Sequence, residues 1–304
     1  MEVSAKRLLL NIFRVGLFEN PYLKIEKTKR TVGKPEFMTE GFNAQLKSVV
    51  LLKNQDKTLP LNTKKTVYIP KRFVPASRNF LGMESPESID FPVNLEMVKK
   101  YFNTTNEPDK ADAALVFIQN PMATIGYDAE DAKKGGNGYV PISLQYENYT
   151  ATEARAESLA GGDPLEDFVN RSYKNKTATT ANITDAQLVA QTKKLMQGKP
   201  VIVSLQTGNP LVFGEIEKYA SAILVNFGVQ DQALFDLLSG KSEPSALLPM
   251  QMPANMATVE RQAEDVPFDM DVYTDSEGNN YDFGFGMNWS GVISDDRTQK
   301  FLKN

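Results

Sequence analysis

Residues 198–253 constrain the fold more than any other part of the chain. They include two continuous apolar runs, 201–205 and 222–227, made mostly of β-branched or large residues. These runs are too short for ordinary helices and lack the alternation of a half-exposed strand, so they predict strands covered on both faces. The segments that follow them, 210–219 and 230–239, have helical spacing. The pattern predicts a strand–helix–strand–helix unit of a parallel sheet.

The rest of the chain extends this pattern. A capping-box pair, Thr184 and Gln187, marks the expected start of the helix before residue 198. We therefore expect an α/β fold with a mostly parallel sheet of about six strands, sandwiched between helices and preceded by an N-terminal linker helix. The further expected elements are strands at 66–69 and 113–118 and helices at 1–18, 39–52 and 95–102.

Two absences in the composition limit the chemistry. The 304 residues include no histidine and no cysteine, which excludes a Ser-His-Asp or Cys-His arrangement within this chain and argues against a zinc site. Acid–base chemistry here would need Asp, Glu, Lys or Tyr, and we expect no metal or organic cofactor. A net charge of −4 gives no excess of positive charge for binding nucleic acid. No apolar run in the sequence is long enough for a membrane-spanning helix.

The first residues indicate a chain that begins inside a larger protein. Residues 1–18 have apolar positions at helical spacing, among them Leu8, Ile12 and Leu17. The apolar run 8–10 is too short for a signal peptide, and no small-residue cleavage site follows it. Residues 20–35 have the composition of a linker.

A long polar segment, 119–150, leaves the expected strand 113–118 at its carboxyl end, where open parallel sheets bind ligands. Loops of this length in a compact domain are commonly functional. Asp128, Glu130 and Glu147 are carboxyl groups of this loop that could take part in acid–base chemistry.

Three ordered motifs resemble family-3 glycoside hydrolases. The first motif consists of Gly- and Pro-containing segments that flank the strands, and it is similar to the corresponding segments of the family's C-terminal α/β domain. These segments are Gly-Lys-Pro at 198–200, Gly-Asn-Pro-Leu at 208–211 and Leu-Leu-Pro-Met-Gln-Met-Pro at 247–253. Residues 14–22 with 48–61 resemble the linker and the domain entry, and Tyr-Asp-Phe-Gly-Phe-Gly-Met-Asn-Trp at 281–289 resembles the terminal motif. The resemblance implies a linker region at 1–35 that includes the last helix of a preceding barrel, and the α/β domain at 36–304.

The resemblance also implies roles in the long loop. In the family, the acid/base Glu precedes a Lys-Gly-Asp-Asn or related segment, and Glu130 followed by Lys134-Gly-Gly-Asn137 is similar in order. Gly136 replaces the family's aspartate and the spacing is longer. Asp128 and Glu147 are lesser candidates for the same role, and the alternative is a solvated loop carboxylate.

Aromatic and amide side chains in the same loop suit a sugar, because rings stack on pyranose CH groups and amides bind hydroxyls. The candidate substrate-binding residues are Tyr127, Lys134, Asn137 and Tyr139. A loop packed on its own domain explains the tyrosines equally well.

The resemblance implies a retaining, β-glucosidase-like hydrolase of terminal β-linked sugars, with this chain as one half. The partners would be a carbohydrate substrate and a family-3 barrel domain, with no nucleic acid or membrane. The family's nucleophilic aspartate belongs to that barrel, so the isolated chain is expected to have little activity. A periplasmic or secreted location would follow from a signal peptide on the missing part. The alternatives are a non-catalytic carbohydrate-binding or scaffold module and, with less support, a flavodoxin-like small-molecule binder.

Overall fold

The computed structural model describes residues 2–78, 82–123, 126–158, 165, 170–263, 266 and 268–300. The chain divides into two compact units, Met1–Ala44 and Gln45–Asn304. The larger unit holds all the described strands. The described helices are α1 (Glu2–Arg14), α2 (Ile25–Thr31), α3 (Pro35–Leu46), α4 (Leu95–Val98), α5 (Ala129–Lys133), α6 (Ile183–Leu195), α7 (Asp231–Leu238), α8 (Met256–Arg261) and α9 (Asp296–Gln299).

An eight-stranded sheet forms the centre of the larger unit, in the order β14-β13-β1-β12-β11-β8-β2-β7. The five strands from β12 to β7 run parallel, whereas β1, β13 and β14 pair antiparallel. The expectation of a mostly parallel sheet between helices is therefore confirmed. The strands of this sheet are β1 (Val50–Asn54), β2 (Thr66–Tyr68), β7 (Asn103–Thr105), β8 (Ala113–Gln119), β11 (Val201–Gln206), β12 (Ala222–Asn226), β13 (Met287–Asn288) and β14 (Gly291–Val292).

Short hairpins complete the described strands. One pair, β3 (Arg72–Val74) with β6 (Ser88–Asp90), follows β2, and β4 (Ser77–Arg78) pairs with β5 (Glu84–Ser85). The third, β9 (Tyr149–Thr150) with β10 (Thr177–Ala178), joins the two ends of the segment that separates the long loop from α6.

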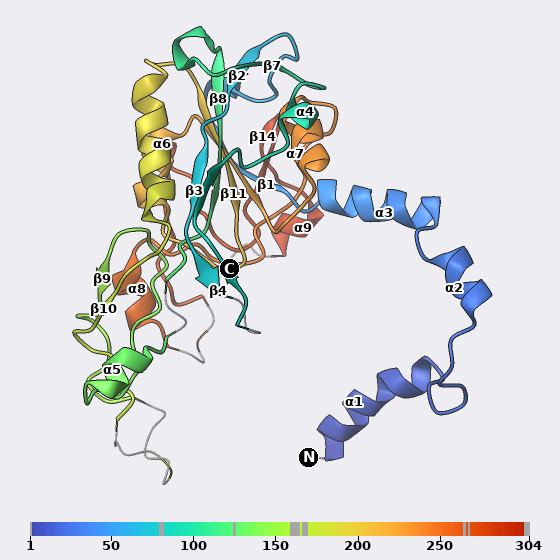
Figure 1. Ribbon diagram of the computed structural model, residues 1–304, viewed down its shortest axis with the longest axis vertical. Coiled ribbons are helices and arrows are strands. Elements are labelled where there is room, and N and C mark those ends of the chain that lie inside the picture. Colours follow the sequence, from blue (N-terminus) through green and yellow to red (C-terminus); the bar gives the residue numbers. More distant parts are fainter. Residues whose placement is uncertain are drawn as a thin grey trace. The chain divides into compact units, whose positions relative to one another are not determined.

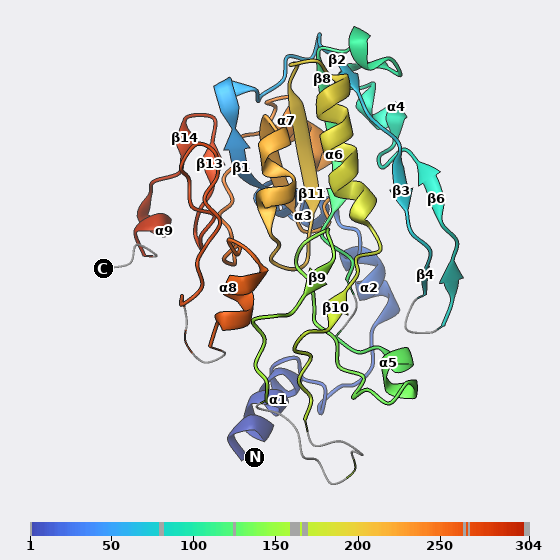
Figure 2. The same ribbon diagram turned by 90° about the vertical axis from the view of Figure 1, so that its left-hand side faces the viewer.

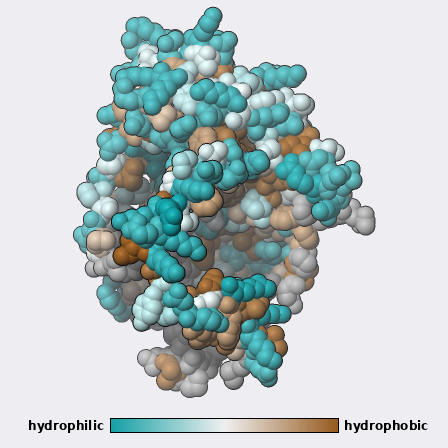
Figure 3. Space-filling model, turned by 90° about the vertical axis from the view of Figure 1, so that its right-hand side faces the viewer, coloured by the Kyte–Doolittle hydropathy of each residue, from teal (hydrophilic) through white to brown (hydrophobic). Residues whose placement is uncertain are grey.

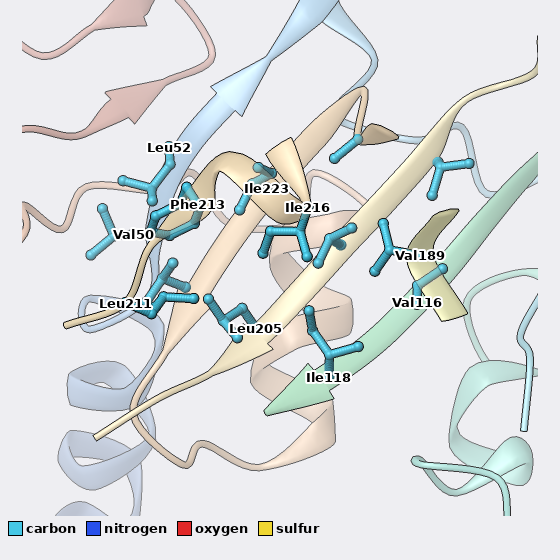
Figure 4. Packing of buried hydrophobic residues seen from close by; sticks show 14 of the residues in the cluster. Val50, Leu52, Val116, Ile118, Val189, Leu205, Leu211, Phe213, Ile216 and Ile223 are labelled. Atoms are coloured by element: carbon cyan, nitrogen blue, oxygen red, sulfur yellow. The ribbon is translucent and has the colours of Figure 1, made fainter. Parts of the chain in front are cut away.

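The central strands of the sheet are buried along almost their whole length, because apolar side chains pack on both faces of the sheet. On one face, Val116, Val203 and Ile223 pack with Val189 of α6. Figure 4 shows Val116, Val189 and Ile223 together. On the other face, Leu115 and its neighbours pack with residues of α4 and α7. Figure 1 shows α6 on one side of the sheet and α4 and α7 on the other, and Figure 2 shows the sheet from the α6 side. Buried runs of this kind account for most of the fold's stabilisation.

The order of the parallel strands identifies a ligand-accessible edge. Strand β2 is flanked by β7 on one side and β8 on the other, so the chain reverses its direction of winding between β2 and β8. In open α/β sheets, ligands bind beyond the carboxyl ends of strands at such a reversal. The loop from Gln119 leaves β8 at this edge, as the sequence predicts.

Three local predictions are wrong. The helix expected at 39–52 ends at Leu46, and Val50 begins β1 because its β-branched and large neighbours pair with β12. Residues 210–219 form two 3₁₀ helices, Phe213–Glu215 and Glu217–Tyr219, rather than one α-helix. Thr184 lies inside α6, whose N-cap is Asn182.

The molecular surface carries scattered apolar side chains. The face drawn in Figure 3 is mostly hydrophilic, with smaller hydrophobic patches. In the smaller unit, Leu8, Phe13 and Tyr22 are exposed, and the described part of α1 buries none of its residues. Across the described residues, no helix combines the length and hydropathy that crossing a membrane requires.

Candidate functional site

Both ends of the long loop are held by polar side chains, which are buried at the first end. Arg72 forms a two-bond ion pair with Asp185, at 2.7 and 2.9 Å, and Asp185 also accepts a hydrogen bond from the backbone N–H of Gln119, where the loop begins. Asn182 accepts a bond from the Met122 N–H and donates to the Asn120 carbonyl. These contacts fix the loop's first residues against the N-terminal end of α6.

The other end of the loop is fixed by a carboxylate. Glu215 accepts hydrogen bonds from the backbone N–H groups of Tyr146 and Glu147, at 2.6 and 2.7 Å. The Tyr146 hydroxyl donates to the Gln119 carbonyl, so the two ends of the loop meet. Glu147, a lesser candidate from the sequence, is exposed here and takes part through its backbone.

The catalytic candidates of the loop lie at α5. The Asp128 side chain caps this short helix by accepting a hydrogen bond from the Glu130 N–H at 2.9 Å. The Glu130 side chain is 62% exposed and pairs with Lys133 at 2.6 Å. Lys134 is exposed and caps the C-terminal end of α5. Solvent therefore reaches the Glu130 carboxylate, and its ionic partner Lys133 is one turn away on the same helix.

Asn137 is part of a polar cluster below α5. Its side-chain amide donates to the carbonyls of Asn170 and Ser172, and its oxygen accepts from the Lys176 ammonium at 2.6 Å. Lys176 also pairs with Asp131 at 2.7 Å. Hydrogen bonding to Lys176 is the main reason that the Asp131 pKa is lowered. The Asn137 amide thus holds the loop together.

The two tyrosines of the predicted sugar site meet edge to face. The rings of Tyr127 and Tyr139 are 5.8 Å apart at an interplanar angle of 84°, and the two residues form a β-bridge. The Arg171 guanidinium lies 5.5 Å from the Tyr139 ring centroid. Gly138, with φ +77°, allows the chain to pass against Tyr127, since a Cβ there would overlap the ring.

Tyr139 also lines a cavity of about 560 Å³, a volume within the usual range for ligand pockets. Tyr173 donates a hydrogen bond to Glu260 in this cavity at 3.3 Å. The lining residues are Gly126, Tyr139, Val140, Ile142, Leu144, Ser158, Arg171, Tyr173, Val259 and Glu260. Of the predicted site residues, Tyr139 alone is among them.

A smaller cavity lies beyond the carboxyl ends of β8, β11 and β12. Its volume is about 80 Å³, and polar side chains such as Arg72, Gln206 and Asn226 contribute to its wall. This volume is well below the usual range for ligand pockets. The larger cavity is therefore the better candidate for a ligand.

Two carboxyl groups that the sequence analysis did not single out have raised pKa values. Burial raises the pKa of Glu215, although bonds from the Tyr146 and Glu147 N–H groups oppose the rise. Burial likewise raises the pKa of Glu260, against the hydrogen bond that Tyr173 donates. Perturbed carboxyls in a cavity are typical of functional sites. No sequence motif marks Glu260. It lies on α8, more than a hundred residues after the loop that carries Tyr139, and only the fold brings the two residues to one cavity.

No cluster of acidic side chains suited to a metal ion occurs among the residues that the structure describes. What the site offers is aromatic rings, one partly buried carboxyl group and an exposed carboxylate on α5.

The family model described as "Glycosyl hydrolase family 3 C-terminal domain" matches residues 49–289. The chain therefore belongs to glycoside hydrolase family 3 and contains its C-terminal α/β domain, as the motifs indicate.

Curated relatives match nearly the whole chain. The chain is 27% identical over 290 residues to a probable β-glucosidase C of Aspergillus flavus, and the aligned region covers 95% of this chain and 35% of the relative. It is 26% identical to β-glucosidase C of Emericella nidulans, over 95% of this chain and 36% of that relative. It is 22% identical to a periplasmic β-glucosidase/β-xylosidase of Dickeya chrysanthemi, over 94% of this chain and 34% of that relative. The chain thus spans about a third of the length of these relatives.

Solved structures share the fold. A β-glucosidase from Listeria innocua, in complex with isofagomine, superposes with a TM-score of 0.52 at 18% identity, over 93% of this chain and 38% of that one. A β-glucosidase from Erythrobacter marinus gives a TM-score of 0.52 at 18% identity, over 94% and 39%.

Proposed function

We propose that this chain is the C-terminal part of a retaining, β-glucosidase-like hydrolase of terminal β-linked sugars. The observation that carries the proposal is the family-3 domain match over 49–289, together with relatives that are named β-glucosidases. The loop from Gln119, at the ligand-accessible edge of the sheet, would form a wall of the sugar pocket. A barrel domain, outside this chain, would complete the pocket and supply the nucleophilic aspartate.

Glu130 is our proposed acid/base, with Asp128 as the alternative. The exposed Glu130 carboxylate is free to face a second domain, whereas one Asp128 oxygen is engaged in capping α5. In the first step of a retaining reaction, protonated Glu130 would give its proton to the glycosidic oxygen, while the barrel's aspartate attacks the anomeric carbon. In the second step, Glu130 would take a proton from the attacking water.

Tyr127, Lys134, Asn137 and Tyr139 are proposed to line the sugar's surroundings. The exposed ring of Tyr127 and the exposed ammonium of Lys134 are the accessible members. Asn137, whose amide is engaged with Asn170 and Ser172, would act by holding the loop in place. A periplasmic location is proposed from the names of the Dickeya chrysanthemi and Salmonella typhimurium relatives.

The test is hydrolysis of an aryl β-glycoside panel by this chain, alone and mixed with a family-3 barrel domain from the same source. Activity only in the mixture, reduced roughly 10²–10⁴-fold by Glu130→Gln, is the expected result. Glu107→Gln is the matched control, because Glu107 also forms an exposed i,i+3 pair with a lysine. Equal activity of the Glu130→Gln and control mixtures would exclude Glu130, and sugar binding without hydrolysis in the mixture would favour a non-catalytic module.

A further inference from the structure

The helix α5 depends on contacts outside itself, because a helix of five residues is too short to be stable alone. Two aspartates make such contacts. Asp128 caps the first turn of α5. One oxygen of Asp131 accepts two hydrogen bonds, from the Lys176 ammonium at 2.7 Å and from the Gly138 backbone N–H at 2.8 Å. The Asp131 carboxylate therefore joins α5 to the loop that follows it and to a segment 45 residues further along the chain.

Lys176 lies in a turn whose backbone is held by hydrogen bonds. It directly precedes β10, and its carbonyl accepts a bond from the Ala151 N–H at 3.0 Å, whereas its own N–H donates to the Tyr173 carbonyl at 3.0 Å. The ammonium also donates to the Asn137 side chain at 2.6 Å. Figures 1 and 2 both show α5 next to β9 and β10. The ammonium that contacts α5 thus extends from a fixed stretch of backbone.

The ion pair between Lys176 and Asp131 is partly shielded from solvent. The two side chains are 25% and 26% exposed, whereas the pair between Lys133 and Glu130 is mostly exposed. Gly136 leaves room for the Asp131 carboxylate, since a Cβ at this position would overlap it. Partial burial reduces the screening of an ion pair by water and salt. The contact with Lys176 should therefore hold α5 more firmly than the contact within the helix does.

The direction of Glu130 follows from that of its neighbour, because consecutive residues of an α-helix point about 100° apart. With Asp131 fixed toward Lys176, the Glu130 side chain points elsewhere and is 62% exposed. We propose that Asp131 and Lys176 are positioning residues that set the direction of the Glu130 carboxyl group. This assignment rests on the proposed function, in which Glu130 is the acid/base. Without the ion pair, α5 would fray or turn, and the carboxyl group would reach the glycosidic oxygen in only a fraction of the molecules.

A misplaced acid should slow some substrates more than others. Protonation of the glycosidic oxygen matters most when the departing phenol is a weak acid, whereas a strongly acidic phenol leaves without it. In the mixture with the barrel domain, Lys176→Met should lower kcat/KM about tenfold for phenyl β-D-glucoside and less than about twofold for 2,4-dinitrophenyl β-D-glucoside. Lys176→Arg keeps the positive charge and should restore most of the loss. A merely structural role would lower kcat/KM equally for both substrates.

Hydrogen exchange of this chain alone tests the ion pair without any hydrolysis. The Lys134 amide donates to the Glu130 carbonyl, and the Gly138 amide donates to the Asp131 carboxylate. Lys176→Met should speed the exchange of both amides about fivefold, which corresponds to losing roughly 1 kcal/mol. Circular dichroism on each variant checks that the domain folds.

The matched control is Lys65→Met. Lys65 pairs with Asp112, a carboxylate that also accepts a backbone N–H, but this pair lies before β8, at the other end of that strand from the loop. The control should change neither the exchange of the α5 amides nor the ratio of the two substrates.

Three results would overturn the proposal: no loss on phenyl β-D-glucoside, equal losses on both glucosides, or unchanged exchange of the α5 amides in Lys176→Met. Inactivity of the unaltered mixture would instead reject the proposed function. The exchange comparison would then still decide whether the ion pair holds α5, so the two failures are distinguishable.

Discussion

Lys53 and Glu217 form an ion pair at 2.5 Å in which each side chain is only 3% exposed. Lys53 lies on β1, and Glu217 lies in the short 3₁₀ helix that leads to β12, the neighbouring strand. Glu217 also accepts hydrogen bonds from the Ser276 and Tyr273 hydroxyls, at 2.8 and 3.2 Å. One buried carboxylate thus joins three parts of the chain that are distant in sequence.

Removing the ammonium is expected to destabilise the domain strongly. Lys53→Met leaves the Glu217 carboxylate buried without its counter-charge, and broken buried pairs cost about 3–5 kcal/mol. Urea unfolding followed by circular dichroism measures the loss. The double variant Lys53→Met with Glu217→Leu should recover part of it, and a single-variant loss below about 1 kcal/mol would contradict the proposed importance of the pair.

The same carboxylate predicts a pH dependence of stability. Burial alone would raise the pKa of Glu217, but hydrogen bonds from Lys53 and Ser276 lower it below the ordinary value of 4.5. An acid with a lowered pKa in the folded state stabilises the fold above its unfolded pKa, and this stabilisation is lost as the pH falls through the folded pKa. The free energy of unfolding should therefore fall below about pH 4.5. Glu217→Gln should flatten this dependence, and an unchanged slope would refute the assignment.

Glu260 is expected to behave in the opposite sense. Its pKa is raised by burial, so its ionisation opposes folding as the pH rises above the unfolded pKa. Glu260→Gln keeps a hydrogen-bond acceptor for Tyr173 and removes the charge. At pH 7.5 the variant should melt at a higher temperature than the parent, because its free energy of unfolding is greater by an amount on the order of 1 kcal/mol or less. At pH 4 the variant and the parent should melt at the same temperature. Calorimetric melting at both pH values is the measurement, and a lower melting temperature at pH 7.5 would be the contrary result.

Gly138 is expected to be needed for the position of Tyr127. Gly138→Ala introduces both backbone strain at φ +77° and a Cβ that overlaps the Tyr127 ring. Gly135→Ala is the matched control, because Gly135 has a similar φ of +89° but open space around it. Both variants should lose about 1 kcal/mol from strain, and Gly138→Ala should lose more. Equal losses in urea unfolding would show that the ring contact is unimportant.

The sequence was most informative where a residue's environment follows from its neighbours in the chain. The unbroken apolar runs at β8, β11 and β12 predicted buried strands. The Gly- and Pro-containing segments that flank β11 and β12 indicated the family. Val50 was assigned to a helix because a short apolar run after a helical segment fits either structure, and its pairing with Val225 is a long-range contact.

The candidate site was predictable only in part for the same reason. The sequence points to the loop from Gln119 and to its Tyr127 and Tyr139 as candidates, and the structure brings the two rings edge to face. Their role in binding a sugar stays a prediction. Glu260 could not be assigned to their surroundings, because its burial and its bond to Tyr173 arise from packing between distant segments. Nor could the sequence indicate that the Asn137 amide is engaged with neighbouring carbonyls.

The anchored ends of the long loop have a consequence for its motions. Gln119 is tied to the buried Asp185 and Tyr146 to the half-buried Glu215, whereas α5 is a short helix between them that buries none of its residues. Backbone amides of α5 should therefore exchange with solvent deuterium through small local openings, at rates insensitive to low urea. The Tyr146 amide should exchange only when the whole domain unfolds. The backbone around Glu130 would thus open and close often, whereas the backbone at Gln119 and Tyr146, the two ends of the loop, would stay in place until the domain unfolds.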